Sequence, residues 1–333
     1  MYTVLAQQLS RVVFFVAQLL FVASQLIIIE DIEVRIQSRF QQRVTWDIFV
    51  ERYKDTPLFR RHLRMSYKSF TNLVRLIQEH VEKNEKMSFI RGGKIIPEVH
   101  LYATIRYLAG GLYSDICNFC GISVPTFYTI IWQAMHAINK TIKVQFPTTP
   151  EQCANLAAKF EDISFRGIIK NCVSAVDGYL LSTNTPTKHY AKNVRQYFSG
   201  HYQKYGINIQ ASCDADCRFT FLGVGGPGVT KDRTGIQESG LYNRVEGLPQ
   251  GYICVADCAY MSTEKMIAVF GGDLALKKEN DNFNFFISQL RIRIEMDFGL
   301  MTRKWGILQH PLTIMMPHIP PLICCIARLH NYY

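Results

Sequence analysis

Two aspartates that close apolar segments are the first candidates for chemistry in this sequence. Asp177 closes "IIKNCVSAVD" and Asp257 closes "GYICVAD". Because strand ends meet solvent at the rim of a sheet, two such carboxylates can share one site although 80 residues separate them. Aspartate also favours turns, and Gly178 follows Asp177, so a turn-forming role is the alternative for each residue alone.

A third carboxylate, Glu295, lies in a predicted long helix. In "FISQLRIRIEMDFGLMTRKW" apolar residues recur at steps of three and four, the spacing of one buried helix face: Ile287, Leu290, Ile294, Phe298, Met301 and Trp305. Glu295 flanks this face at the edge of the core. It meets there either Arg291, four residues earlier, as an ordinary ion pair, or another cation.

Three carboxylates that converge repel one another unless cations lie among them. Oxygen ligands suit Mg²⁺ or Mn²⁺. Two such ions about 4 Å apart activate a water or a 3′-hydroxyl and stabilise the leaving oxygen in phosphodiester displacement. If Asp177, Asp257 and Glu295 meet, the pattern therefore indicates a metal-dependent nuclease.

The second half of the chain, 153–333, must position these residues. The segment "IIKNCVSAVDGYLLST" is predicted as a strand ending near Asp177, and "GINIQASCDADCRFTFLGVGG" as a hairpin that turns at residues 214–216. A helix in "TKDRTGIQESGLYNRV", a strand in "GYICVADCAY" and the helix of Glu295 follow. This order predicts an α/β fold with a mixed sheet. A turn role accounts for Asp214.

The preceding part, 44–146, is predicted to be helical. Ser66 caps one helix, and a second runs from Pro97 to Gly110. "YSDICNFCGISVPTFYTIIWQAMHAINK" predicts a helix-turn-helix in which Ser123 caps the second helix. Thr126, Tyr128 and Thr129 would then face a DNA groove, whereas a helical hairpin that binds no DNA is the alternative. The Pro/Thr-rich "QFPTTPEQ" marks the boundary between the two halves.

The charge of the chain points to a polyanionic partner. The net charge is +10 and the isoelectric point about 9.1, and residues 35–100 contain fourteen Lys/Arg against seven Asp/Glu. Nucleic acid is the leading candidate, and a merely soluble basic protein is the alternative.

The cysteines fit a reduced compartment, whereas the N-terminus carries an apolar run close to the lower limit for a membrane span. Ten cysteines are scattered, several within apolar segments, so they are expected to be buried thiols; "CNFC" is the one zinc-like spacing. Residues 12–29 form an apolar run of 18 residues. We expect 1–43 to be an extension or a buried or amphipathic helix, and expect no membrane span, because nothing downstream has membrane character.

An ordered set of motifs resembles one known family. "AVDG", "SCDADCRF", "GGPGVTKDR", "VADCAY", "FNFFISQLRIRIEMDFG" and "CCIARLHNYY" occur in the order found in PIF/Harbinger transposases, a DDE-superfamily group that includes domesticated Harbinger-derived nucleases. The resemblance begins near Thr56 and includes "FRRHLRMSYKSF" and "IRYLAGG". As an ordered set these motifs are specific, although none is specific alone.

The resemblance implies an RNase H-like catalytic domain at 153–333 with Asp177, Asp257 and Glu295 as the DDE triad. Asp232 matches a further acidic position and is a candidate auxiliary ligand, and two Mg²⁺ or Mn²⁺ ions are the implied cofactors. Several basic residues are then expected to contact the DNA backbone: Lys188, Lys192, Arg195, Arg291, Arg303 and Lys304. For each of them a solvated surface charge is the alternative.

The family also implies cleavage at transposon terminal repeats, a nuclear location, a Myb-like partner protein and a homo-oligomer. The alternative function is a transposase-derived factor that binds DNA or protein without cutting. The apolar start and the end soon after "LHNYY" depart from the family pattern and favour that alternative, whereas the intact triad favours the enzyme.

Overall fold

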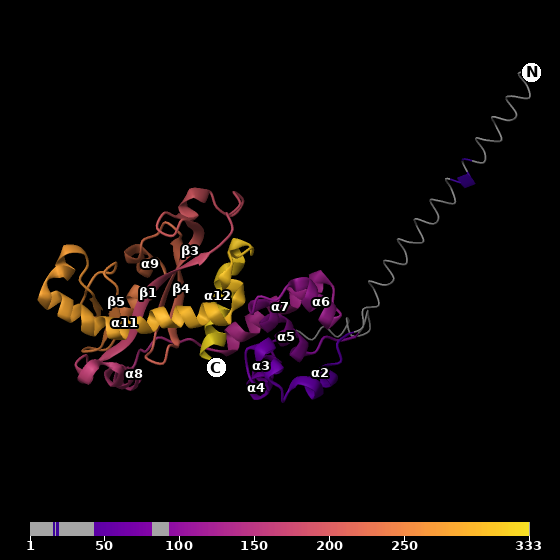
Figure 1. The fold of residues 1–333 in the computed structure, drawn as a ribbon, viewed down its shortest axis with the longest axis horizontal. Helices are drawn as coiled ribbons and strands as arrows, with labels where there is room; N and C mark the ends of the chain where they lie inside the picture. The colour runs from indigo at the N-terminus through magenta and orange to yellow at the C-terminus, as the bar shows by residue number, and fades with distance from the viewer. Residues whose placement is uncertain (1–15, 17, 20–42, 82–92, 333) are drawn as a thin grey trace, which may run out of the picture.

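The computed structural model describes residues 43–81 and 93–332, together with Val16, Gln18 and Leu19 (Figure 1). Almost all of the predicted 1–43 extension, with its apolar run, lies outside these residues. Within the described part of the chain, no helix combines the length and the apolar character needed to cross a membrane.

The first part of the described chain is helical, as predicted. Its helices are α2 (Trp46–Tyr53), α3 (Pro57–Leu63), α4 (Tyr67–Ile77), α5 (Pro97–Leu108), α6 (Tyr113–Cys120) and α7 (Val124–Thr141). Ser66 and Ser123 cap α4 and α7, each accepting a hydrogen bond from the backbone N–H three residues later, at 3.1 and 3.4 Å. Gly121 ends α6 with a φ of 63°, which a side chain would disfavour, and so makes the turn to α7. Cys117 and Cys120 are free, buried thiols in this packing.

The second part contains a mixed sheet. Its strands are β1 (Cys172–Ser182), β2 (Phe198–Ser199), β3 (Lys204–Cys213), β4 (Phe219–Pro227), β5 (Ile253–Ala256) and β6 (Met266–Ala268). The order is β4–β3–β1–β5–β6, with β2 paired to the start of β3. Strand β3 is antiparallel to β1 and β4, whereas β5 is parallel to β1 and β6 to β5. This is the RNase H-like arrangement that the resemblance implied.

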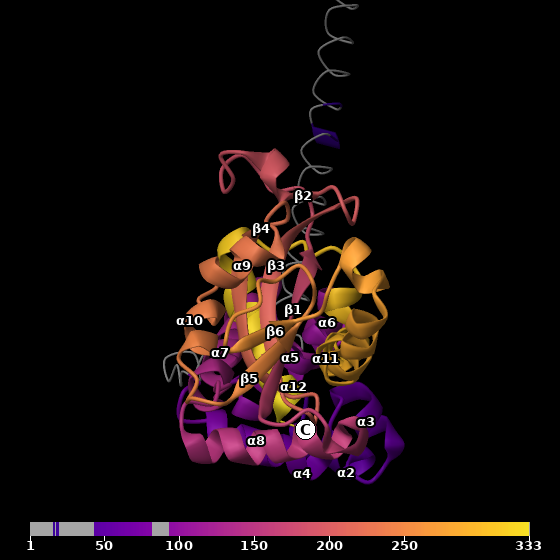
Figure 2. The ribbon, with the colours of Figure 1, turned by 90° about the vertical axis from the view of Figure 1, so that its left-hand side faces the viewer.

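Helices cover the two faces of the sheet (Figure 2). They are α8 (Pro150–Ile163), α9 (Asp232–Glu238), α10 (Leu241–Glu246), α11 (Lys278–Lys304) and α12 (Ile319–Asn331). Short 3₁₀ turns are η2 (Phe165–Gly167), η3 (Val194–Tyr197), η4 (Gly272–Leu276), η5 (Gly306–Gln309) and η6 (Met316–His318). Helix α11 lies along one face, where Phe298 stacks on Tyr179 of β1 at 5.1 Å between ring centroids. Helices α9 and α10 pack on the other face, where Ile236 and Leu241 join Val173 and Val176 in one apolar cluster.

Two expected boundaries differ from the structure. Strand β1 does not end near Asp177 but continues to Ser182, because β3 pairs with it along that stretch, with Asp177 opposite Ala211. The single helix expected after β4 is divided into α9 and α10, because Gly240 adopts a left-handed φ of 79°. The predicted hairpin is present, and Asp214 has the expected turn role: its Oδ1 accepts the backbone N–H groups of Asp216 and Arg218 at 2.9 and 3.0 Å.

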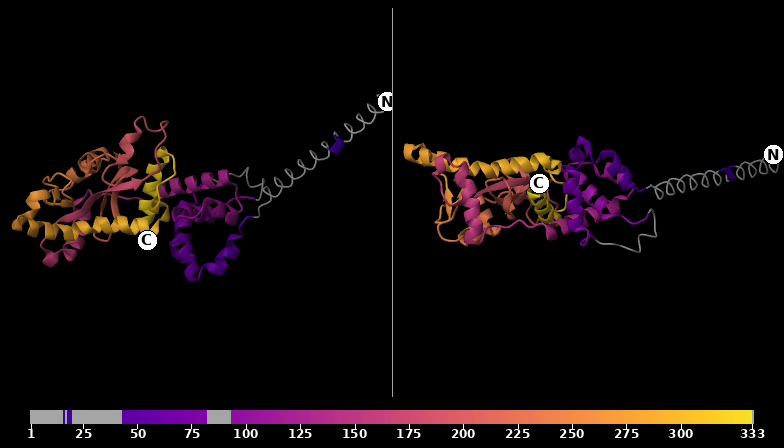
Figure 3. Two further views of the ribbon diagram at one scale, coloured as in Figure 1. Left: turned by 45° about the horizontal axis from the view of Figure 1, so that its top comes forward. Right: turned by 90° about the horizontal axis from the view of Figure 1, so that it is seen from below.

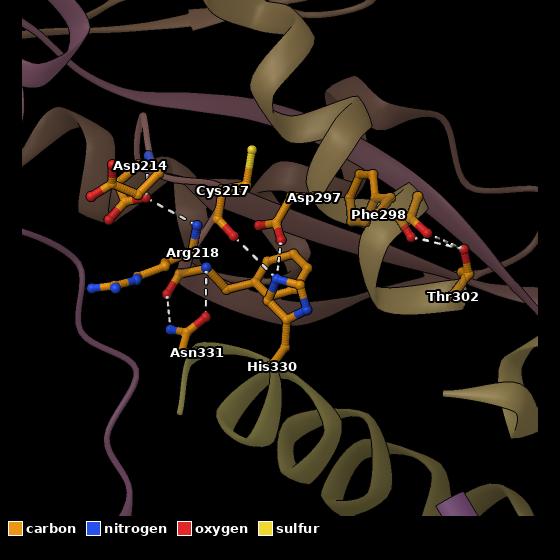
Figure 4. A network of polar contacts seen from close by, with 11 residues as sticks. Asp214, Cys217, Arg218, Asp297, Phe298, Thr302, His330 and Asn331 are labelled. Carbon is orange, nitrogen blue, oxygen red and sulfur yellow. Dashed lines mark hydrogen bonds and ion pairs between the residues drawn. The ribbon is translucent and has the colours of Figure 1, made fainter. Parts of the chain in front are cut away.

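The end of α12 ties α11 to the edge of the sheet (Figure 4). The Asn331 side chain exchanges two hydrogen bonds with the backbone of Phe219 in β4, at 2.9 and 2.7 Å. Next to it, His330 Nε2 lies 2.7 Å from Oδ1 of Asp297 on α11 and 3.1 Å from the Cys217 carbonyl oxygen. Asp297 is fully buried, and burial raises its pKa to about 6 although the contact with His330 opposes the shift.

We predict that His330→Ala lowers the free energy of unfolding by about 3 kcal/mol at neutral pH. The reason is that the substitution leaves the buried Asp297 carboxylate without a partner, since no other donor among the described residues reaches it. Urea unfolding followed by circular dichroism measures this. Adding Asp297→Ala to that variant should restore part of the loss, and a double variant less stable than His330→Ala would contradict the pairing.

Candidate active site

The pairing of β1 with β5 brings Asp177 and Asp257 together. The two strands are parallel neighbours, and their register pairs Val176 with Ala256. Asp177 and Asp257 each follow one residue later, so they lie side by side across strands about 4.8 Å apart. Each carboxylate is fixed in the same way, because its Oδ1 accepts the N–H of the next residue, Gly178 at 2.8 Å and Cys258 at 2.6 Å.

The alternation of side chains places both aspartates on the α11 face of the sheet. Tyr179, two residues after Asp177, stacks on α11, so the Asp177 side chain emerges on that same face. Helix α11 in turn presents Glu295 and Arg291, one helical turn apart. The three predicted triad residues therefore line one cleft of about 660 Å³, together with Asp232 and Arg291.

Arg291 lies between the carboxylates. Its Nη1 forms an ion pair with Glu295 and lies 3.9 Å from Asp177 Oδ2. The ion pair weighed as the alternative for Glu295 is thus present in the structure, in the same cleft as the aspartates. Arg291, which is also among the residues expected to contact DNA, makes these contacts within the cleft. The Glu295 side chain is 48% exposed, so this end of the site opens to solvent.

Asp177 is in an environment that disfavours its charge. Burial raises the pKa of its carboxyl to about 7, with Asp257 and Asp232 adding to the rise. The N–H of Gly178 and the Arg291 guanidinium act in the opposite direction and do not cancel it. A carboxylate held with too little positive charge around it is a typical feature of a site that takes up a cation.

Asp232 approaches from the opposite face of the sheet. Its Oδ1 accepts hydrogen bonds from Asn208 at 3.1 Å and Gln210 at 2.9 Å. It occupies the space in which a Cβ on Gly178 would stand, so only glycine fits at residue 178. Asp232 therefore lines the cleft from behind β1, with one oxygen already engaged.

A row of buried polar residues on β3, of which Asn208 and Gln210 hold Asp232, was missed in the sequence. Asn208, Gln210 and Ser212 alternate along β3 and are buried. The Tyr260 hydroxyl donates to Gln210 Oε1 at 2.7 Å and completes the network. Polar residues at every second position of a buried strand were the available signal, because buried polar side chains require partners.

The donor set of the cleft suits a hard divalent cation. All candidate ligands are carboxylate oxygens, which Mg²⁺ and Mn²⁺ prefer. Burial, with Asp257 and Asp232, raises the pKa of Asp177, so a bound cation would favour its charged form. Within the described residues, no three His, Cys, Asp or Glu side chains converge closely enough to hold an ion as they stand. Asp177, Asp257 and Glu295 line the same cleft, and Glu295 is paired there with Arg291.

The other residues expected to contact DNA lie outside this cleft. Lys188, Lys192 and Arg195 are exposed in the loop after β1 and do not line it. Arg303 and Lys304 form the last turn of α11. Thr126 and Thr129 lie in the first turns of α7, where the Thr129 hydroxyl donates to the Pro125 carbonyl at 3.0 Å, and Tyr128 is exposed.

Comparison with known proteins agrees with this geometry. Residues 176–331 match the model of the family described as DDE superfamily endonuclease. Protein ALP1-like of Arabidopsis thaliana is 25% identical over 207 residues, which cover 60% of this chain and 49% of that protein. The match thus spans about half the length of this relative. No solved structure matches the chain. The matched residues 176–331, which carry Asp177, Asp257 and Glu295, are thus similar to the DDE superfamily endonucleases.

Proposed function

We propose that this protein is a divalent-metal-dependent DNA endonuclease of PIF/Harbinger type that cuts at transposon terminal repeats. The observation that carries the proposal is the convergence of Asp177, Asp257 and Glu295 on one open cleft. The match to the endonuclease family supports the reaction class. The net charge of +10 supports a polyanionic substrate.

In this proposal Asp177 and Asp257 hold the cations, with Glu295 as the third ligand and Asp232 as a neighbouring charge. Bound divalent ions would supply the activated oxygen nucleophile and the stabilisation of the leaving oxygen. The N–H groups of Gly178 and Cys258 orient the two aspartates by holding one oxygen of each. Before the ions bind, Arg291 partly offsets the negative charge of Asp177 and Glu295.

The position of Arg291 favours a second candidate function. A guanidinium paired with Asp177 and Glu295 already supplies positive charge at the site. A protein in which this pairing persists would keep the fold and the basic surface but would not cut. Such a chain would be a transposase-derived factor that binds DNA or protein.

Cleavage of supercoiled plasmid distinguishes the two functions. We predict that the purified protein nicks plasmid with Mg²⁺ or Mn²⁺ and that Asp177→Asn or Asp257→Asn lowers the rate on the order of 1,000-fold, because each removes a charged ligand. Asp273→Asn, in the exposed turn η4, is the matched control and should cut as the wild type does.

Equal cutting by Asp177→Asn and the wild type would remove Asp177 from the mechanism. If neither the wild type nor Arg291→Ala cuts, while both bind DNA, the second candidate is supported and the enzyme is excluded.

Asp177→Asn should also stabilise the protein in the presence of chelator. In the folded protein the pKa of Asp177 is raised to about 7 from its ordinary value of 3.8, so the contribution of Asp177 to stability is lost as pH rises from about 4 to about 7. Asparagine cannot ionise, so its advantage should grow over this range to about 2–4 kcal/mol at pH 8. Urea unfolding at pH 5 and pH 8 measures the change, with Asp273→Asn as control. If the difference in free energy of unfolding between Asp177→Asn and the wild type is the same at both pH values, the raised pKa of the buried Asp177 carboxyl is contradicted.

A further inference from the structure

A group of basic residues gathers where the helical part meets the catalytic part. Figures 1 and 3 show the helices α2–α7 next to the carboxyl end of α11. The close approach is between backbones, since a Cβ on Gly306 would stand 2.5 Å from the Ala109 carbonyl oxygen at the end of α5. On the other side, Arg106 of α5 donates to the His62 carbonyl of α3 at 3.4 Å. The carboxyl ends of α3, α5 and α11 therefore meet.

We name this group the junction cluster. Its members are the basic residues in or directly after the last turns of these three helices: Arg60, Arg61, Arg64, Arg106, Arg303 and Lys304. Arg60, Arg61 and Arg303 are exposed, and the others are half-buried.

The positive charge of the junction cluster exceeds what the helices need. Each helix carboxyl end carries about −0.5 charge, so three ends supply about 1.5 negative charges against six basic side chains. Within the described residues, no carboxylate forms an ion pair with Arg60, Arg61, Arg64 or Arg303. A compact group of cations whose positive charge is not compensated by the protein attracts a polyanionic ligand.

Two observations show that the cluster is costly to the folded protein. Burial, followed by the charges of Arg60 and Arg64, lowers the pKa of Lys304 to about 8. Arg64 follows α3 in the left-handed region, at a φ of 58°, where glycine is the usual residue. A side chain there costs roughly 1 kcal/mol. Unfavourable charge and backbone strain kept at one place point to a function there.

The predicted helix-turn-helix has the opposite character. Helices α6 and α7 together contain a single Lys or Arg, Lys140 in the last turn of α7. The exposed residues at their other end include Leu112, Tyr113, Val124 and Tyr128. Within the described residues, these two helices therefore contribute few cations of their own to salt-sensitive phosphate contacts.

We infer that the junction cluster, rather than the start of α7, holds the phosphate backbone of duplex DNA. The inference rests on the proposed function for the identity of the polyanion. Arg303 is eight residues from Glu295 on α11, about 12 Å along the helix axis. A duplex that leaves the active site along α11 therefore reaches the cluster after three or four base pairs, at about 3.4 Å each.

The test measures binding of a fluorescent 30-base-pair duplex to the full chain by anisotropy, in chelator and across a salt series. Arg60→Ala with Arg61→Ala should weaken binding roughly 10- to 100-fold at 0.1 M salt and reduce the slope of log Kd against log salt by about 2, because each lost phosphate contact removes about 0.9. Lys140→Ala with Lys143→Ala removes the same charge from exposed positions at the other end of α7 and should change neither value. Circular dichroism confirms that the variants fold.

An unchanged affinity and slope in the Arg60/Arg61 variant would overturn the inference. So would a result in which Tyr128→Ala, measured in the same assay, loses affinity for the duplex while the Arg60/Arg61 variant keeps it. The inference would also be overturned if the wild-type protein showed no measurable binding to the duplex but bound vesicles of anionic lipid. Because the binding assay contains chelator, metal-dependent cleavage does not affect the measured affinity. A wild-type protein that binds DNA through the junction cluster but does not cut plasmid would support this inference and contradict the proposed nuclease function.

Discussion

The parallel register of β1 and β5 is the constraint on which the whole site depends. It sets Val176 beside Ala256, so the next residue of each chain segment is an aspartate on the same face. A shift of one residue in either strand would send one carboxylate to the opposite face. The register is fixed by buried apolar residues on both strands, such as Val173, Cys254 and Val255. Burial of the core thus holds together two groups that repel one another.

Much of this site could be predicted from the sequence because its signals are local. Apolar runs that reach Asp177 and Asp257, and the three-and-four spacing around Glu295, each indicate one element and the face of that element. The helical caps at Ser66 and Ser123 are equally local. What these signals share is that burial or hydrogen bonding within one segment decides the structure.

The features that were missed depend on contacts between distant segments. The sequence does not show that β1 continues past Asp177, because the pairing with β3 decides it. The sequence also does not show that Asp232 reaches the cleft from the sheet face opposite α11. That position depends on the packing of α9 and α10 on that face. Glu295 combines two roles that its sequence context presents as alternatives: it pairs with Arg291 and it lines the same cleft as Asp177 and Asp257. The four-residue spacing in the sequence predicts the Arg291–Glu295 ion pair. It cannot predict that the fold brings Asp177 next to the same arginine.

Helix α11 is a single continuous element of 27 residues, about 40 Å long. It carries Glu295 at the cleft and Arg303 at the meeting point of three helix ends. A rigid rod transmits its axial position and its rotation, so a ligand that fixes one end restricts the other. If divalent ions bind at Glu295 and a polyanion binds at Arg303, the two binding events are thermodynamically linked. The factor by which bound metal changes the affinity for the polyanion then equals the factor by which the bound polyanion changes the affinity for metal. In such a protein the affinity for DNA depends on whether metal is bound, and the affinity for metal depends on whether DNA is bound.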